Sequence, residues 1–234
     1  MGSFAEITNG RERWSGNHSV ARHRHARPYA AVILAGSYEE CGTHGRFRVG
    51  AGDVLLHGAF DAHLDRFQKA GAHILNLILD SRPAYPLGRV CDPDRIAVLA
   101  ERDPAEAGIR LTVEMTKKDA PVIDWPDLLA NDLLRETDCR LDEWARRHDV
   151  SPETLSRGFG KVFGVTPVAF RLEQRARAAF ASIQNDGPPL AVVAAQTGFS
   201  DQAHMSRAIR TLTGQTPGYW RRSNSFKTDR PRAA

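Results

Sequence analysis

The chain has few cysteines, no long apolar run and little net charge for its 234 residues. Its cysteines, Cys41, Cys91 and Cys139, are odd in number, widely spaced and without a CxxC arrangement, so they predict reduced thiols rather than a disulfide framework. No apolar stretch approaches the roughly 20 residues of a membrane span, and the first residues lack the apolar block of a signal peptide. We therefore expect a cytoplasmic protein without a membrane anchor.

The basic residues are unevenly distributed. The net charge of +4 and the isoelectric point near 9.2 permit nucleic-acid binding without requiring it. Residues 140–222, however, hold 12 Lys and Arg against 7 Asp and Glu, a surplus of 5 that exceeds that of the whole chain. The length suits two domains, and the basic excess points to the second of them as the partner of nucleic acid.

An internal repeat organises the second half of the chain. Residues 151–170, SPETLSRGFGKVFGVTPVAF, return in residues 200–220, SDQAHMSRAIRTLTGQTPGYW. Just upstream the spacing is 49 rather than 50, which pairs Ser151 with Ser200 and indicates one extra residue in the second copy's turn. The positions spaced by 50 are Arg157 with Arg207, Gly164 with Gly214, Thr166 with Thr216, Pro167 with Pro217 and Phe170 with Trp220.

Each copy reads as a short apolar helix, a tight turn and a second helix opened by a capping residue, Ser151 or Ser200. This is the pattern of a helix-turn-helix, whose second helix can lie in the major groove of DNA. The helices expected in this half cover residues 125–136, 141–148, 152–163, 167–184, 190–197, 201–213 and 217–222.

The stretch GFSDQAHMSRAIRTLTGQTPGYWRR at residues 198–222, with its weaker partner SPETLSRGFGKVFGVTP, resembles the signature of the AraC family of bacterial transcription regulators. The resemblance covers about the last hundred residues. It implies an all-α domain in which two helix-turn-helix units are joined by one long helix and read two successive major grooves.

We call the second helix of each helix-turn-helix, residues 152–163 and 201–213, a reading helix. Helical spacing separates the core positions from the surface positions in both. Leu155, Phe159 and Val162 share one face, and Met205, Ile209 and Leu212 share another, so both faces should pack inward. The base-reading residues that the resemblance implies are Glu153, Ser156, Arg157, Gln202, Ala203, Ser206 and Arg207.

Among these, Arg157 and Arg207 can bind guanine bidentately and Gln202 can pair with adenine. The alternative for both arginines is a solvated or ion-paired helix face. Other arginines of the domain are expected to contact phosphates or to lie on the surface, namely Arg171, Arg175, Arg177, Arg221 and Arg222.

The first half of the chain is β-rich. Residues 29–40, 46–60 and 72–80 read as short strands with glycine turns, which favours an antiparallel barrel or sandwich, while the first twenty residues read as a tail or a loose first strand. Helical stretches follow near 94–102 and 105–114. We place a sensor or dimerisation domain at residues 1–120, the DNA-binding domain at 121–223 and a disordered tail at 224–234.

Three histidines frame the expected strands. The order of His23 and His25 in an HxH pair, Gly36, the Gly52–Asp53 dipeptide and His63 resembles the two motifs of the cupin barrel. In metal-binding cupins this implies a metal held by the HxH pair, a carboxylate and the late histidine; here Tyr29 stands at the carboxylate position. Three imidazoles can nevertheless hold a divalent metal such as zinc. The alternative is that His23 and His25 belong to a solvated basic stretch, with His63 in a turn.

The leading hypothesis is an effector-responsive transcription regulator, commonly an activator, which binds operator DNA, meets RNA polymerase, forms a homodimer and is not an enzyme. Its effector is a small molecule or a metal. One alternative is a metal-dependent cupin enzyme fused to a DNA-binding domain. Another is a barrel that only pairs subunits and has no ligand.

Overall fold

A computed structural model describes residues 3–81, 84–135, 139–184 and 188–228, with side chains described as far as Ser223. The chain divides into two compact units: Gly2–Leu128 with Lys161–Gly164, and Leu129–Gly160 with Val165–Ala234. Residue 120, where the sequence predicts the domain boundary, lies in the segment between the last strand and the third helix. No helix within the described ranges has the length and apolar character needed to cross a membrane. The three cysteines are free thiols.

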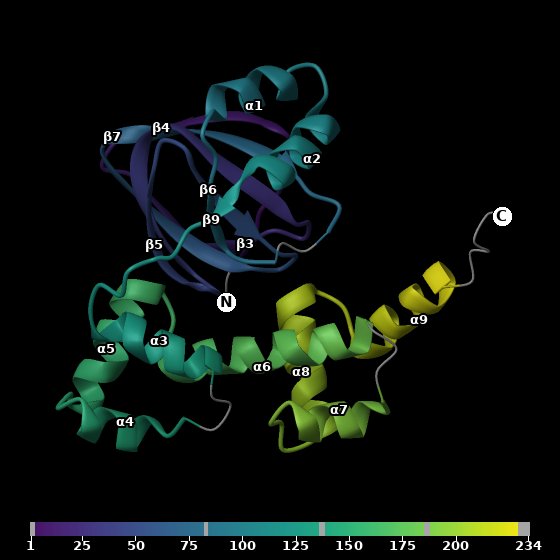
Figure 1. Cartoon of the computed structure of the whole chain (residues 1–234). Coiled ribbons are helices and arrows are strands. Elements are labelled where there is room, and N and C mark those ends of the chain that lie inside the picture. The colour runs from purple at the N-terminus through teal and green to yellow at the C-terminus, as the bar shows by residue number, and fades with distance from the viewer. Residues whose placement is uncertain (1–2, 82–83, 136–138, 185–187, 229–234) are drawn as a thin grey trace. The chain divides into compact units, whose positions relative to one another are not determined.

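The amino-terminal unit is built on one mixed, strongly curved sheet (Figure 1). In the described residues its order is β1-β3-β7-β4-β6-β8-β9, with β2 paired to β7 and β5 to β4. The strands are β1 (Ser3–Phe4), β2 (Gly10–Trp14), β3 (Ser19–Arg24), β4 (Tyr29–Gly42), β5 (Gly45–Gly50), β6 (Asp53–His57), β7 (Ala62–Ile78), β8 (Leu87–Arg89) and β9 (Thr116–Lys117).

The predicted β-rich half is thus confirmed, but two expectations were wrong. The first residues are not a tail or a loose strand, because β2 pairs along its whole length with β7 and the Trp14 ring stacks on Phe67 at 5.2 Å. The strand expected at 72–80 begins ten residues earlier, at Ala62, because polar residues such as His63 and Asp65 hid its apolar face.

The two long strands β4 and β7 carry matching irregularities. Their register shifts between Ile33 and Ala35 and again between Gly36 and Tyr38. Gly36 has a φ of 75°, and a Cβ on it would lie 2.1 Å from the Gly71 carbonyl oxygen, so only glycine fits there. The shift changes which alternate residues of each strand face the inside of the sheet.

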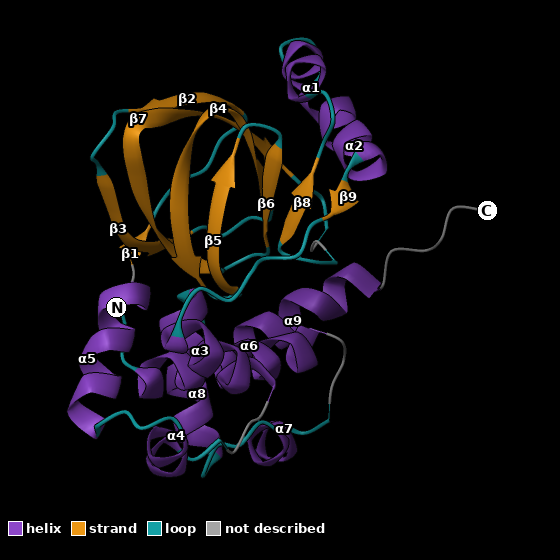
Figure 2. Cartoon of the chain, turned by 60° about the vertical axis from the view of Figure 1, so that its left-hand side comes forward, coloured by secondary structure: helices purple, strands orange, loops and turns teal. Residues whose placement is uncertain are grey.

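The sheet has apolar packing on both faces. On the outer face, Ala30, Val32, Leu75 and Leu77 pack with residues of α1 and α2 such as Ile96 and Leu111. These helices, α1 (Pro93–Ala100) and α2 (Pro104–Glu114), lie together beside the sheet in Figure 2, close to their predicted positions. The inner face holds a second cluster that includes Ala31, Ile33, Tyr38, Phe67 and Ile74.

The second unit is all-helical, as predicted. Figure 1 shows α6 as the long helix that joins the two short-helix pairs. The helices are α3 (Trp125–Arg135), α4 (Leu141–Arg147), α5 (Pro152–Phe163), α6 (Pro167–Gln184), α7 (Leu190–Gln196), α8 (Gln202–Thr213) and α9 (Pro217–Thr228). Helix α9 continues past its predicted end at Arg222 into the predicted tail, and residues 229–234 lie outside the described residues.

The repeated Gly-x-Thr-Pro has the same structural role in both copies. Gly164 and Gly214 follow a reading helix with φ of 71° and 78°, the left-handed conformation that ends helices. Thr166 and Thr216 then accept the backbone N–H groups of Ala169 and Tyr219 through their hydroxyls, and each proline occupies the first position of the next helix. The repeat therefore encodes a helix stop followed by a helix start.

The two turns differ by one residue, and the structure shows which. Ser151 caps α5 by accepting the Thr154 N–H at 3.2 Å. The cap of α8 is Asp201, which accepts the His204 N–H at 2.7 Å, and not Ser200 as predicted. Ser200 instead donates its hydroxyl to the Asp201 carboxylate at 3.1 Å, so it is the extra residue of the second turn.

Candidate functional site

The reading helices present the predicted faces. Leu155 and Phe159 are buried on α5, as are Met205, Ile209 and Leu212 on α8. The prediction for Val162 was wrong: it is only half-buried, and Phe163 takes the inward position at 0% exposure because the helix ends there. Of the predicted base-reading residues, Glu153, Ser156, Arg157, Gln202, Ala203 and Arg207 are exposed and Ser206 is half-buried.

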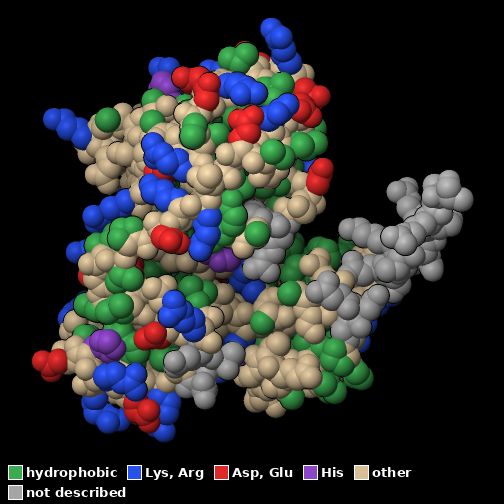
Figure 3. Space-filling view, in the orientation of Figure 1, with side chains coloured by type: hydrophobic (Ala, Val, Ile, Leu, Met, Phe, Trp, Pro, Cys, Tyr) green, Lys and Arg blue, Asp and Glu red, His purple; other side chains and the backbone are tan. Residues whose placement is uncertain are grey.

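Basic side chains gather over α4, interspersed with acidic ones (Figure 3). Arg140 and Arg146 both contact the Asp142 carboxylate, at 3.1 and 3.9 Å, so part of this charge is compensated on the helix itself. Two of the arginines expected at phosphates or on the surface also have backbone contacts: Arg175 donates to the Gly198 carbonyl at 2.9 Å and Arg221 donates to the Pro188 carbonyl. These contacts brace the turn before α8 and the start of α7.

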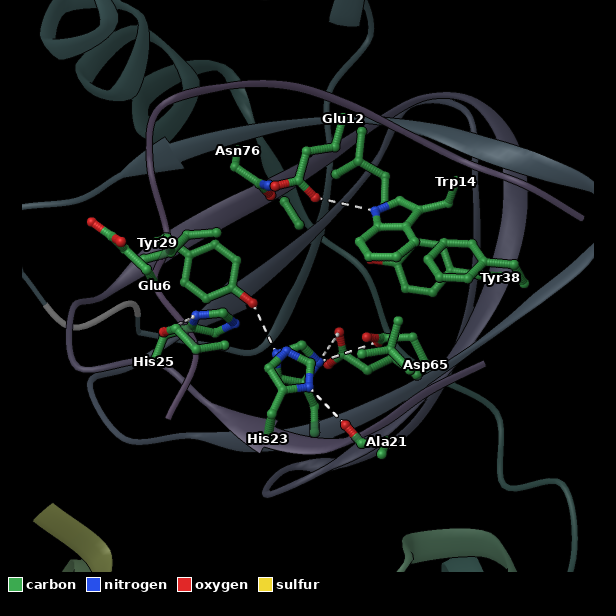
Figure 4. A pocket seen from close by; sticks show the side chains of 18 of the residues that line it. Glu6, Glu12, Trp14, Ala21, His23, His25, Tyr29, Tyr38, Asp65 and Asn76 are labelled. Atoms are coloured by element: carbon green, nitrogen blue, oxygen red, sulfur yellow. Dashed lines mark hydrogen bonds and ion pairs between the residues drawn. The ribbon is translucent and has the colours of Figure 1, made fainter. Parts of the chain in front are cut away.

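A second candidate site is a cavity of about 440 Å³ on the inner face of the curved sheet. Figure 4 shows Tyr29 and His25 on one side of it, Trp14 with Tyr38 on the other, and His23 and Asp65 along the edge between them. Among the described residues that line it there is no Lys or Arg. Its carboxylates are Glu6, Glu12, Glu40 and Asp65, and its larger apolar side chains are Ile7, Trp14, Val20, Tyr38, Phe67 and Ile74.

The three predicted histidines converge at this cavity. One ring nitrogen from each of His23, His25 and His63 lies within 4.8 Å of the others. Their exposed fractions are only 9%, 6% and 5%, so the alternative of a solvated basic stretch is wrong. His23 lies near the end of β3, and His25 is the first residue after that strand. His63 opposes His23 in the antiparallel β3–β7 pair.

In each of the three rings, Nδ1 is the nitrogen that contacts a backbone carbonyl or a carboxylate. His23 Nδ1 lies 2.9 Å from the Ala21 carbonyl oxygen, and His25 Nδ1 lies 2.9 Å from that of Ala5. A carbonyl oxygen only accepts, so Nδ1 carries a proton in both rings, and in the neutral form of either ring the lone pair lies on Nε2. This is how proteins orient histidines that bind metals through Nε2.

The ring of His63 has different neighbours on its two nitrogens. Its Nδ1 faces Asp65 Oδ1 at 3.2 Å and Glu40 Oε2 at 3.5 Å. Its Nε2 accepts a hydrogen bond from the Tyr29 hydroxyl at 3.0 Å. His63 therefore also offers a lone pair on Nε2, with the carboxylates serving as acceptors on the opposite side of the ring.

Burial changes the pKa values in this cluster. Loss of solvent, together with the neighbouring His23, lowers the pKa of His25 to about 4, and burial lowers those of His57 and His63 well below the ordinary value. Burial raises the pKa of Glu40 well above its usual range and that of Asp65 to about 6. These imidazoles are neutral at physiological pH, which is the protonation state that binds metals.

A strained turn precedes His63. Phe60 has a φ of 65°, which bulky side chains rarely adopt, and its N–H donates to the His25 carbonyl at 2.7 Å. This bond ties the turn before β7 to the end of the HxH segment. Strain of this kind persists where surrounding contacts impose it and is frequent at functional sites.

Sequence reasoning missed three members of the cluster. His57 is buried, stacks on Tyr29 at 4.3 Å and places Nε2 3.5 Å from Glu40 Oε2. Glu40 and Asp65 were not singled out. The only available signal was that each stands an even number of residues from an inward-facing aromatic, Tyr38 or Phe67, on its own strand.

Comparisons with known proteins agree with the helical unit. A family described as "Helix-turn-helix domain" matches residues 144–223. The arabinose operon regulatory protein of Escherichia coli (strain K12) is 29% identical over 91 residues, which cover 39% of this chain and 31% of that protein. The same-named protein of Salmonella typhimurium is 32% identical over 72 residues, covering 31% and 26%. The matched regions thus span less than a third of these curated relatives.

Solved structures with similarity include the C-terminal domain of AraT, a response regulator from Geobacillus stearothermophilus, at 22% identity and a TM-score of 0.38, covering 42% of this chain and 84% of that one. ToxT from Vibrio cholerae is similar at 12% identity and a TM-score of 0.39, covering 91% and 97%. The helix geometry and the family match define the class of residues 144–223, which form a helix-turn-helix DNA-binding domain. Over this region the chain is similar to the arabinose operon regulatory proteins, in the same residues that carry the resemblance described above.

Proposed function

We propose that the protein is a transcription regulator that reads operator DNA with α5 and α8 and responds to an effector held in the amino-terminal unit. The observation that carries the proposal is the duplicated helix-turn-helix, in which both second helices bury one face and expose six of the seven residues predicted to read bases. Both curated relatives are named as operon regulatory proteins, which supports a regulator over the enzyme alternative.

The proposal is tested by selecting binding sites for the full-length protein from a random pool of duplex DNA. We expect an enriched sequence with two short conserved blocks separated by about 34 Å along one face of the helix, since the two reading helices enter successive major grooves. Binding should weaken steeply with salt because arginines displace counterions from phosphates. Recovery of unselected sequences at the affinity of the starting pool would contradict a sequence-specific regulator.

The effector that we propose is neutral or cationic rather than anionic. The cavity has four carboxyl groups and lacks Lys and Arg among its described lining residues, so a carboxylate or phosphate ligand would find no basic side chain to pair with there. Aromatic side chains such as Trp14 and Phe67 offer stacking surface beside these acids. Effector binding would favour one arrangement of the protein on DNA through its differential affinity for the two states.

The partners and location expected from the sequence remain part of this proposal. We propose that the protein acts as a homodimer in the cytoplasm, meets RNA polymerase at its promoters and activates more often than it represses. No catalytic role is proposed, because the two carboxyl groups beside the histidines, Glu40 and Asp65, contact Nδ1 of His63 and serve to orient that ring.

We also propose that His23, His25 and His63 hold one divalent metal ion, such as zinc, at the floor of the cavity. The residues fit such an ion: the three rings are buried and close together, and each has its Nδ1 engaged by a backbone carbonyl or a carboxylate, so that Nε2 is the nitrogen left to bind an ion. An ion there would cross-link β3, the residue after it and β7, and would stabilise the folded amino-terminal unit by mass action.

Removing the ligands should remove the metal. Full-length protein purified without added metal or chelator should contain about one equivalent by elemental analysis, and the His23→Ala/His63→Ala double variant should contain none. The control is His73→Ala, a histidine of β7 that does not line the cavity, which should keep the metal. Equal metal contents in the wild type and the folded double variant would contradict the assignment.

A further inference from the structure

Tyr29 stands where the cupin pattern would place a carboxylate ligand, and its environment gives it a specific part at this site. It begins β4, is 3% exposed and stacks on His57. Its ring centroid lies 4.9 Å from that of His25, and in Figure 4 its hydroxyl points from beside His25 toward His23. The hydroxyl therefore lies at the histidine cluster, 3.0 Å from Nε2 of His63.

The hydroxyl's partner shows where an ion would meet it. Tyr29 donates to Nε2 of His63, the nitrogen that the carboxylates leave available. An ion bound to this Nε2 would sit about 2.0–2.1 Å from it, on the side that the Tyr29 oxygen now occupies at 3.0 Å. On metal binding the phenol oxygen is either displaced from this space or becomes a ligand.

The buried carboxylates lie at the other nitrogen of His63: Glu40, His63 and Asp65 form a second group of potential ligands, separate from that of the three histidines. Asp65 and Glu40 contact Nδ1 of His63, on the other side of the ring from Nε2. Glu40 also faces His57 Nε2 at 3.5 Å. Both carboxylates thus act as acceptors that orient His63, which is the usual role of a carboxylate behind a metal-bound histidine.

From this arrangement we infer that the Tyr29 oxygen is the fourth protein ligand of the metal, in the place of the missing carboxylate. When the ion binds, Tyr29 and His63 each exchange their mutual hydrogen bond for a bond to the ion, and the phenol proton passes to solvent. The inference rests on the proposed metal site. It does not depend on the DNA-binding function.

A three-histidine, one-tyrosine set fills all four positions of a tetrahedral ion. Structural zinc sites have four protein ligands, whereas catalytic sites keep one position for water or substrate. The ion would therefore have a structural or sensing role. A tetrahedral ion with these four ligands has no open coordination position for a substrate, as the enzyme alternative would need.

The test uses copper as a spectroscopic probe in the full-length protein. Cu²⁺ binds imidazole sites most tightly of the divalent first-row ions, and a phenolate ligand adds a charge-transfer absorption band in which resonance Raman excitation enhances phenolate ring vibrations. Metal-free wild type titrated with one equivalent of Cu²⁺ should bind it and show the band. Tyr29→Phe should bind copper through the three histidines and lose both the band and the phenolate vibrations.

Tyr38→Phe is the matched control, since Tyr38 is also buried and lines the same cavity, and it should keep the band. The inference would be overturned if the wild type bound no copper or bound it without the band. It would also be overturned if the band persisted in Tyr29→Phe or was lost in Tyr38→Phe alone. Binding to the selected DNA site, measured on the same preparations, shows separately whether the regulator function holds.

Discussion

Replacing Arg207 by alanine is expected to weaken binding to the selected operator by about 1–3 kcal/mol, roughly 5- to 150-fold in Kd, and to relax the preference at one base position. Arg207 is exposed on α8, and Gln202 and Ala203 open the same helix with exposed side chains. The loss should fall on the guanine that the guanidinium contacts, because a bidentate pair distinguishes bases while a phosphate contact does not. Arg157→Ala should weaken binding and relax one base preference in the other half of the site, because Arg157 on α5 is the residue that corresponds to Arg207 in the internal repeat.

The control for both variants is Arg146→Ala. Arg146 is an exposed arginine of α4 whose charge is partly met by Asp142, so its replacement changes the net charge equally without touching a reading helix. Dissociation constants are measured for the selected site and for each single-base change at fixed salt. If Arg207→Ala lowered affinity uniformly for all sites, as a phosphate contact would, the assignment of this residue to base reading would be wrong.

Phe159→Ala is expected to lower the free energy of unfolding of the helical unit by about 3–5 kcal/mol. Phe159 is fully buried on α5, and its ring packs edge-on against Phe170 of α6 at 5.4 Å between centroids. Removing it leaves a cavity between the first reading helix and the long helix that joins the two halves. A cost of this size approaches the whole stability of many domains, so DNA binding should fall as well.

The measurement is denaturant unfolding of the full chain followed by helical circular dichroism, together with hydrogen exchange of α5 and α6. Val168→Ala provides the comparison, because Val168 is 64% exposed at the start of α6 and should change stability by less than about 0.5 kcal/mol. Equal losses for the two variants would show that Phe159 does not hold α5 in place.

The helical unit was predictable because its signals are local. A glycine that ends a helix, a threonine cap and a proline at the first position recur in both copies. Every predicted helix is present, and the bounds agree closely except for α9, which ends at Thr228 rather than at Arg222. The errors were local too. Asp201 rather than Ser200 caps α8, because two adjacent residues could both serve as caps and only the backbone geometry distinguishes them.

The sequence by itself determined that the chain carries two helix-turn-helix units and that three histidines sit in or beside neighbouring strands. Only the tertiary structure decided that Glu40, Asp65, His57 and Tyr29 join those histidines. On β4 the inward positions are Tyr29, Ala31 and Ile33 before the irregularity at Gly36, and Tyr38 and Glu40 after it. On β7 they shift likewise, from His63, Asp65 and Phe67 to Ala72 and Ile74 on the far side of Gly71. Alternation along a strand has a period of two, so a bulge moves every later side chain to the other face, and its position depends on the close contact of two distant glycines.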